Sequence, residues 1–223
     1  MAVSGGNLKL LLAFSGAFLL ALTLFHLLPE VYVQNKNNNA GIFILAGFII
    51  QILLDYISKG VEHGHVHSED FMSQSFPYAV FVGLCIHSFL EALPLGTVNT
   101  EMGTLYESDF KNNLFLGILI HNVPISVALG GVLIDFFKNH KKALIWLVVF
   151  SLAGPAGILT SALLTNFNAT LSADIEPLML AVVVGILLHV STIILFESSD
   201  KHKFNTKKLL VILFGFLISY LTL

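Results

Sequence analysis

Long apolar runs separated by short polar stretches dominate the sequence. A helix rises 1.5 Å per residue, so about 20 apolar residues cross a hydrocarbon layer of about 30 Å. By this criterion the pattern predicts seven membrane-spanning helices, at residues 8–28, 40–57, 78–97, 114–136, 143–165, 178–196 and 208–223. The predicted fold class is therefore all-α: a polytopic transmembrane helical bundle that forms a single domain over residues 1–223.

The composition agrees with a location in lipid. Of the 223 residues, 56% are hydrophobic and 11% are charged, whereas a typical soluble domain carries about 25% charged residues. We therefore expect most of the surface to contact membrane lipid. The basic residues are dispersed lysines without a single arginine, which argues against nucleic acid as a partner. One cysteine, Cys85, excludes an internal disulfide.

The lysines predict the orientation of the bundle, because basic residues in short loops stay on the cytoplasmic side. With the N-terminus inside, only Lys36 and Lys111 fall outside. The inner segments hold the other nine: Lys9, Lys59, Lys138, Lys141, Lys142, Lys201, Lys203, Lys207 and Lys208. Six acids then lie on the outer side: Glu30, Glu101, Glu107, Asp109, Asp174 and Glu176.

One carboxylate, Glu91, falls in the interior of a predicted span. An ionisable residue at this depth is costly and marks a functional site by default. His87 precedes Glu91 by four residues, so both side chains share one helical face. His121 and Asn122 lie at a similar depth in the next, antiparallel span.

Imidazole and carboxylate ligands suit zinc and its first-row neighbours, whereas calcium and magnesium prefer oxygen. His87, Glu91 and His121 therefore form the candidate metal site. The alternative is that these side chains only form hydrogen bonds between helices, with Glu91 protonated or paired to a histidine. The grouping of three such residues at one depth favours the metal site.

A cytoplasmic loop over residues 58–76 contains three alternating histidines, His63, His65 and His67, with acids nearby. An extended segment places alternate side chains on one face, which predicts weak metal binding in this loop. The alternative is a solvated polar loop without a selected role.

Several motifs together resemble the Zrt/Irt-like (ZIP) family of divalent metal transporters. They are Phe14-Ser-Gly with His26-Leu-Leu-Pro-Glu30 in the first span, the histidine loop, and His87-Ser-x-x-Glu91 in the third span. His121-Asn-x-Pro124 in the fourth span and Gly154-Pro-x-Gly157 in the fifth complete the set. The likeness extends over nearly the whole chain.

The resemblance implies the family's fold of eight helices, with a metal site built by the fourth and fifth. The predicted span at residues 8–28 then corresponds to the family's second helix, and the family's first helix has no counterpart in this sequence. The seven predicted spans thus correspond to helices two to eight.

The resemblance also implies one metal position where the family often has two. Ser88 and Asn122 fall on positions that the second metal uses in the family. Two acids of that second position are replaced, by Ile125 and Gly154, and Ala92 stands where glycine usually follows the glutamate. We therefore predict a mononuclear site.

The predicted function is transport of a divalent metal ion toward the cytoplasm through this site, not enzymatic catalysis. The ion, Zn²⁺ or else Fe²⁺, Mn²⁺ or Cd²⁺, is the substrate, and no organic cofactor is expected. Two alternatives remain open: a seven-span intramembrane zinc hydrolase and a transport-inactive regulatory homologue. We expect a multi-pass protein of a bacterial inner membrane, and Gly130-Gly131 leaves a homodimer open.

Overall fold

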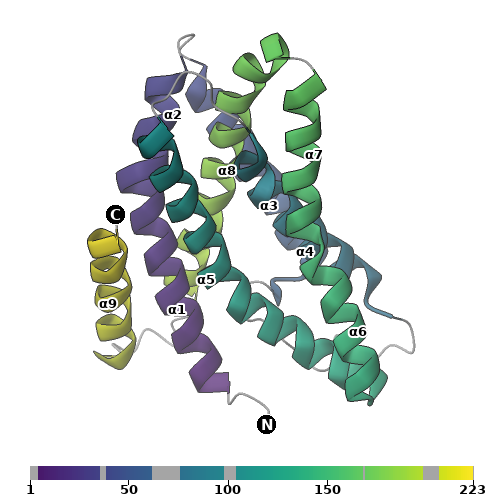
Figure 1. The fold of residues 1–223 in the computed structure, drawn as a ribbon. Coiled ribbons are helices and arrows are strands. Elements are labelled where there is room, and N and C mark those ends of the chain that lie inside the picture. The colour runs from purple at the N-terminus through teal and green to yellow at the C-terminus, as the bar shows by residue number, and fades with distance from the viewer. Residues whose placement is uncertain are drawn as a thin grey trace.

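The computed structural model describes residues 5–35, 39–61, 76–97, 104–167, 169–197 and 206–222, and within these ranges every regular element is helical (Figure 1). The α-helices are α1 (Gly5–Leu22), α2 (Leu28–Gln34), α3 (Ala40–Ser58), α4 (Tyr78–Ala92), α5 (Thr104–Phe137), α6 (His140–Ser151), α7 (Ala153–Phe167), α8 (Ala169–Glu197) and α9 (Thr206–Thr222). A π-helical turn joins α1 to α2, and a 3₁₀ turn follows α4.

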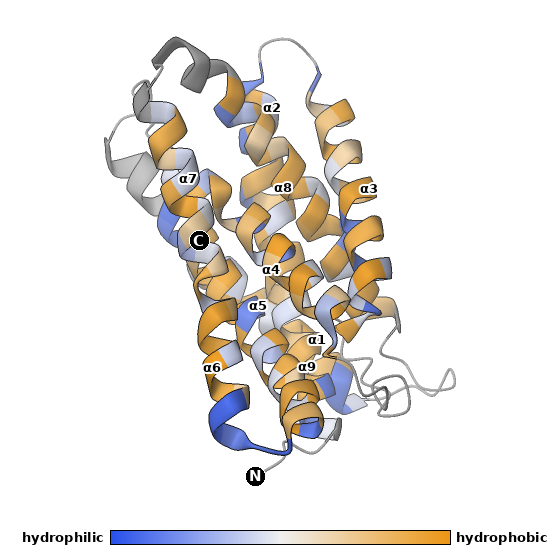
Figure 2. Cartoon of the chain, turned by 90° about the vertical axis from the view of Figure 1, so that its right-hand side faces the viewer, coloured by the Kyte–Doolittle hydropathy of each residue, from blue (hydrophilic) through white to orange (hydrophobic). Residues whose placement is uncertain are grey.

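Six stretches are long and apolar enough to cross a membrane, which confirms the polytopic helical bundle. They are Gly6–Gln34, Ala40–Ser58, Tyr78–Gly96, Lys111–Phe137, His140–Thr165 and Ile175–Phe196. The seventh predicted span is the helix α9, whose 17 residues make it shorter than a typical crossing. Figure 2 shows apolar residues along most of the length of the helices, with polar residues at the helix ends and at a few places partway along. The chain is an integral, multi-pass membrane protein.

Three predicted span boundaries differ from the structure for identifiable reasons. The first span continues beyond residue 28 to Gln34, because the π-helical turn Thr23–Leu27 carries the helix into α2. The fifth span is two helices that meet at Leu152, where the Leu152 N–H bonds to the Val149 carbonyl oxygen and the chain turns before Pro155. Helix α8 begins well before residue 178, and Pro177 lies inside it.

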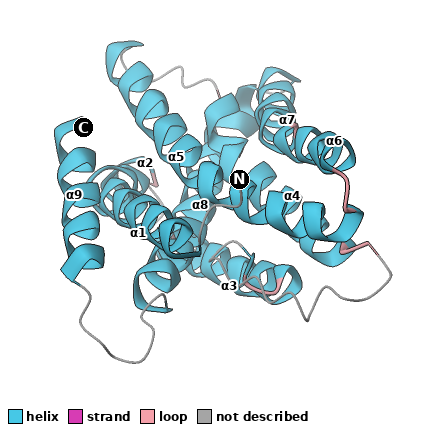
Figure 3. Cartoon of the chain, turned by 90° about the horizontal axis from the view of Figure 1, so that it is seen from below, coloured by secondary structure: helices cyan, strands magenta, loops and turns pink. Residues whose placement is uncertain are grey.

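Glycine allows two helix pairs to approach closely. Gly47 of α3 faces the Val182 carbonyl of α8, and Gly185 of α8 faces the Ile44 carbonyl of α3, so a Cβ at either glycine would overlap backbone. Gly157 of α7 faces Phe89 of α4 in the same way. Figure 3, seen from below, shows α8 within the bundle and α3, α6 and α9 toward its edge.

Burial separates central from peripheral helices. In an apolar stretch of 18 residues from each span, 61% of the residues are buried in the spans containing α1 and α8, against 22% in α3 and 17% in the α6–α7 span. Large apolar side chains of α3, such as Ile42 and Leu53, are correspondingly exposed. In a membrane protein these exposed faces are the surfaces that contact lipid.

The buried apolar side chains form two main clusters. The first apolar cluster joins α1, α2, α8 and the beginning of α5, and includes Leu22, Leu187 and Ile118. The second apolar cluster joins α4, α6 and the later part of α5, and includes Leu84, Phe150, and Ile125. Helix α5 therefore contributes to both clusters, and His121 lies between the two contributions.

Candidate metal site

Helix α4 positions the first two candidate ligands. His87 and Glu91 lie one helical turn apart and are 1% and 0% exposed. The Nε2 atom of His87 is 3.2 Å from Oε1 of Glu91. Pro94 is placed in the 3₁₀ turn Leu93–Gly96, so α4 ends directly after Glu91. The predicted shared face of these two residues is confirmed.

Helix α5 brings the third candidate ligand to the same place. His121 is fully buried, and its ring centroid lies 5.8 Å from that of His87, with the two ring planes inclined by 76°. Helix α5 continues past Pro124, so this proline does not interrupt the element that carries His121. The structure thus confirms that His121 approaches the pair on α4.

The three residues together have the spacing of a metal site. One potential ligand atom from each of His87, Glu91 and His121 lies within 4.8 Å of the other two. Zinc lies about 2.0–2.2 Å from nitrogen or oxygen ligands, so two of its ligand atoms are at most about 4.4 Å apart. In the tetrahedral geometry usual for zinc, two such atoms are about 3.3–3.6 Å apart, so the three side chains would have to move closer together to bind an ion. That these residues bind metal remains a prediction.

The two further candidates lie next to these ligands in sequence. Ser88 is 5% exposed on α4. The Oδ1 atom of Asn122 is buried and has no hydrogen-bond partner among the described residues. A buried amide oxygen without a partner costs free energy that a cation or water would recover. That this oxygen serves as an additional metal ligand remains a prediction.

Ile125 and Gly154 stand at the two positions where the family often has acids, and the structure shows what surrounds each of them. Ile125 is fully buried in the second apolar cluster. A Cβ built on Gly154 of α7 would lie 3.6 Å from Oγ of Ser88 and 3.9 Å from Cβ of Ala92. The structure therefore places Gly154 against the face of α4 that carries Ser88, and leaves ordinary contact distances for a side chain there.

Sequence reasoning missed Gln51, which contacts the candidate site from α3. Gln51 is fully buried, and its Oε1 atom is 2.9 Å from Nδ1 of His87. The available signal was a single amide inside the apolar run 40–57. A buried amide is costly unless hydrogen-bonded, so a lone amide in such a run predicts a polar partner in a neighbouring span.

Two further carboxylates are buried near the ends of spans, outside the span interior in which the sequence places Glu91. Glu176, which was placed in an outer loop, lies in α8 and is 7% exposed, and Thr97 donates to its Oε1 atom at 2.8 Å. Glu30 is 6% exposed in α2 and accepts from Gln34 at 2.8 Å. Each of these hydrogen bonds offsets part of the free-energy cost of burying the carboxylate.

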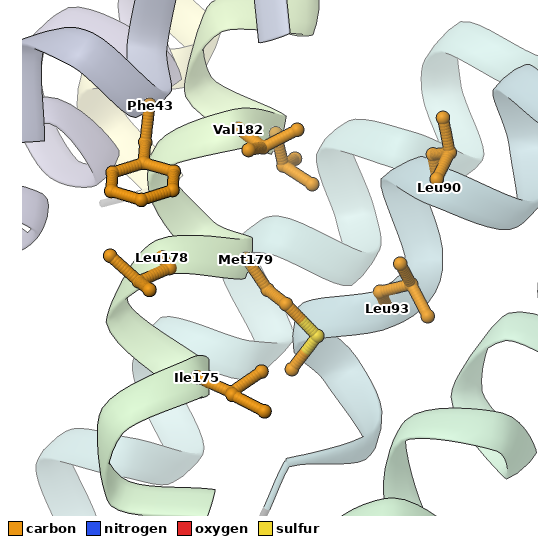
Figure 4. Close-up of a pocket in the computed structure, with 8 residues that line it drawn as sticks. Phe43, Leu90, Leu93, Ile175, Leu178, Met179 and Val182 are labelled. Atoms are coloured by element: carbon orange, nitrogen blue, oxygen red, sulfur yellow. The ribbon is translucent and has the colours of Figure 1, made fainter. Parts of the chain in front are cut away.

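A pocket of about 180 Å³ lies between α3, α8 and the end of α4 (Figure 4). Its walls are apolar and consist of Phe43, Leu90, Leu93, Ile175, Leu178, Met179, Val182 and Val183. Leu90 precedes Glu91 directly, but no carboxylate or imidazole lines the pocket. This pocket therefore offers no binding site for a hard or borderline cation.

The histidine loop cannot be placed, since His63, His65 and His67 lie outside the described residues. Helix α3 ends before this loop at Ser58, and the next two residues, Lys59 and Gly60, both have positive φ. Metal binding by the loop and the orientation of the bundle remain predictions.

Comparison with known proteins identifies related sequences. The family model described as ZIP zinc transporter matches residues 62–222. The zinc transporter ZIP9 of Micropogonias undulatus is 24% identical over 156 residues, which cover 69% of this chain and 49% of that protein. ZIP9-A of Xenopus laevis is 23% identical over 163 residues, covering 72% of this chain and 52% of that protein.

A third relative is the protein zntD of Dictyostelium discoideum, which is 24% identical over 154 residues, covering 65% of this chain and 21% of that protein. The chain thus spans about half the length of the ZIP9 proteins and about a fifth of zntD. No solved structure matches the chain.

Proposed function

This chain belongs to the ZIP zinc transporter family, and from that premise we propose that it moves Zn²⁺ or a similar divalent ion across the membrane. The observation that supports this function most directly is the buried group of His87, Glu91 and His121, whose potential ligand atoms lie within 4.8 Å of one another. Two helices that cross the apolar layer supply these ligands.

The ligand chemistry suits a transition metal that is carried and then released. Two neutral imidazoles and one carboxylate favour zinc over calcium or magnesium. The ionised Glu91 supplies one negative charge, so a bound divalent ion leaves one positive charge uncompensated by the three ligands. This imbalance weakens retention and favours passage. Movement toward the cytoplasm is what the resemblance to the family implies, and the lysine distribution predicts only which side of the bundle is cytoplasmic.

We propose a single ion at this site. Ser88 and Asn122 supply neutral oxygen atoms, while Ile125 and Gly154 supply none. A second divalent ion beside the first would add repulsion without a second carboxylate to offset it. The charge count therefore favours a mononuclear site.

The hydrolase alternative is disfavoured by the same group of residues. A catalytic zinc site needs protein ligands, an ordered water and usually a separate acid or base. Among the described residues the group contains one carboxylate, Glu91, which would have to bind the metal and act as the base. The two ZIP9 relatives are zinc transporters by name.

Uptake of labelled zinc into proteoliposomes tests the proposed function. We expect saturable uptake by the unmodified protein and its loss in the His87→Ala and Glu91→Gln variants. Matched controls are His140→Ala and Asp135→Asn, because both residues are exposed at the ends of α6 and α5. Equal uptake in the site and control variants would contradict the site. No uptake by the unmodified protein, with zinc still bound, would favour the inactive regulatory homologue.

A further inference from the structure

The ring of His87 lies between two buried polar side chains. Its Nε2 atom is 3.2 Å from Oε1 of Glu91 on the same helix. Its Nδ1 atom is 2.9 Å from Oε1 of Gln51 on α3. All three residues are at most 1% exposed. The two ring nitrogens therefore face different surroundings, one toward the candidate ligands and the other toward α3.

The chemistry of a metal-binding histidine assigns the proton between these nitrogens. A neutral imidazole binds a metal through the nitrogen that carries a lone pair, and the other nitrogen then carries the proton. Because Nε2 of His87 faces Glu91, Nε2 is the nitrogen placed to bind the ion. Nδ1–H then donates to Oε1 of Gln51. An acceptor of this kind fixes both the tautomer and the ring orientation of a metal ligand.

We infer that Gln51 is a positioning residue that holds His87 in the tautomer and orientation required for metal binding. This inference rests on the proposed function, in which His87 is a ligand. Gln51 does not belong to the group of potential ligands itself. Its effect on the ion passes through the hydrogen bond to Nδ1 of His87.

The position of Gln51 is fixed by packing that is independent of the ligands. Gln51 lies one turn beyond Gly47 on α3, the residue that contacts the Val182 carbonyl of α8. Neither α3 nor α8 contributes a residue to the group of three potential ligands. The close α3–α8 pair therefore fixes, independently of the ligand group, the backbone from which Gln51 reaches His87.

Two substitutions of similar size separate positioning from simple packing. Gln51→Met fills the same space without an acceptor, whereas Gln51→Glu keeps an oxygen acceptor for Nδ1–H. We expect Gln51→Met to lower Zn²⁺ affinity about 10–100-fold, as for loss of other orienting partners, and Gln51→Glu to restore it. Affinity is measured by titrating the purified full chain in nanodiscs, and the Co²⁺ absorption spectrum reports the ligand geometry.

Thermal unfolding of each variant separates an effect on the metal from an effect on the fold. Unchanged affinity in Gln51→Met would overturn the inference. Equal loss of affinity in both variants, accompanied by equal loss of thermal stability, would also overturn it and indicate a structural role.

A double-substitution cycle distinguishes this inference from the proposed function. If Gln51 acts through His87, then Gln51→Met has no further effect on affinity in the His87→Ala background. Undiminished Zn²⁺ affinity in His87→Ala alone would overturn both the proposed site and the positioning role. Lost affinity in His87→Ala with full affinity in Gln51→Met would overturn the positioning role alone.

Discussion

His87 and His121 approach each other across α4 and α5 with ring centroids 5.8 Å apart and ring planes inclined by 76°. This relationship places two imidazoles beside the single carboxylate of Glu91. A site with two imidazoles and one carboxylate should prefer borderline transition metals, because nitrogen ligands select these metals over hard cations.

The first prediction concerns metal selectivity. Co²⁺ and Cd²⁺ should compete with Zn²⁺ for the protein, while a large excess of Mg²⁺ should not. The His121→Asp variant replaces an imidazole with a carboxylate and should shift the preference toward Mn²⁺. Competition titrations in nanodiscs measure this change. The exposed His140→Asp variant is the control, and an identical selectivity shift in both variants would refute the role of His121.

The second prediction concerns stoichiometry. The unmodified protein should bind one Zn²⁺ ion in the membrane site, since Ile125 and Gly154 supply no carboxylate. A side chain at Gly154 would meet Ser88 at an ordinary contact distance of 3.6 Å, so Gly154→Asp should fold and add a charged ligand beside Ser88 and Asn122. We expect the Gly154→Asp variant to bind close to two Zn²⁺ ions per chain in the membrane site.

Metal analysis of purified protein measures this stoichiometry, with the loop histidines His63, His65 and His67 replaced by alanine to remove their contribution. Gly154→Asn is the matched control, because it adds a side chain of similar size without the charge. Two tightly bound ions in the unmodified membrane site would contradict the mononuclear assignment.

The third prediction concerns the contact between α3 and α8. A Cβ at Gly47 or Gly185 would overlap a backbone carbonyl of the facing helix, and backbone cannot move aside like a flexible side chain. Gly47→Ala and Gly185→Ala should each destabilise the protein by about 1–3 kcal/mol or more. Gly131→Ala is the control, since nothing lies within 4 Å of its added Cβ.

Thermal unfolding in detergent compares these variants. Gly131 lies inside α5, where alanine is intrinsically favoured over glycine by about 0.5–1 kcal/mol. The control should therefore match or exceed the unmodified protein in stability. Equal thermal stability of Gly47→Ala and Gly131→Ala would contradict the close contact between α3 and α8.

Local periodicity explains what the sequence could predict. The apolar runs locate the spans, and the four-residue spacing of His87 and Glu91 determines their shared face, because both depend only on helix geometry. The approach of His121 follows from its similar depth in an antiparallel span. These inferences need no knowledge of how distant helices are rotated about their axes.

Other features depend on information that a local pattern does not carry. The contact of Gln51 with His87 joins residues 36 positions apart and requires the rotation of α3 relative to α4. Glu176 resembles a loop residue because it is charged and precedes a proline, yet it lies in α8. There it accepts a hydrogen bond from the hydroxyl of Thr97, 79 positions away. Such partners emerge only when the helices pack.

The candidate site lies where helix α5 passes from the first apolar cluster to the second. His121 lies on α5 between Ile118 of the first cluster and Ile125 of the second, and Pro124 lies in the same stretch. Shearing one cluster against the other would leave the interior of each intact and concentrate the strain where α5 passes between them. The hydrogen bond between His87 and Gln51 joins α4, which belongs to the second cluster, to α3, which packs against α8 of the first cluster. If His87 binds the ion as proposed, a displacement of α4 relative to α3 would break this hydrogen bond, so that access to the site and affinity for the ion would be coupled.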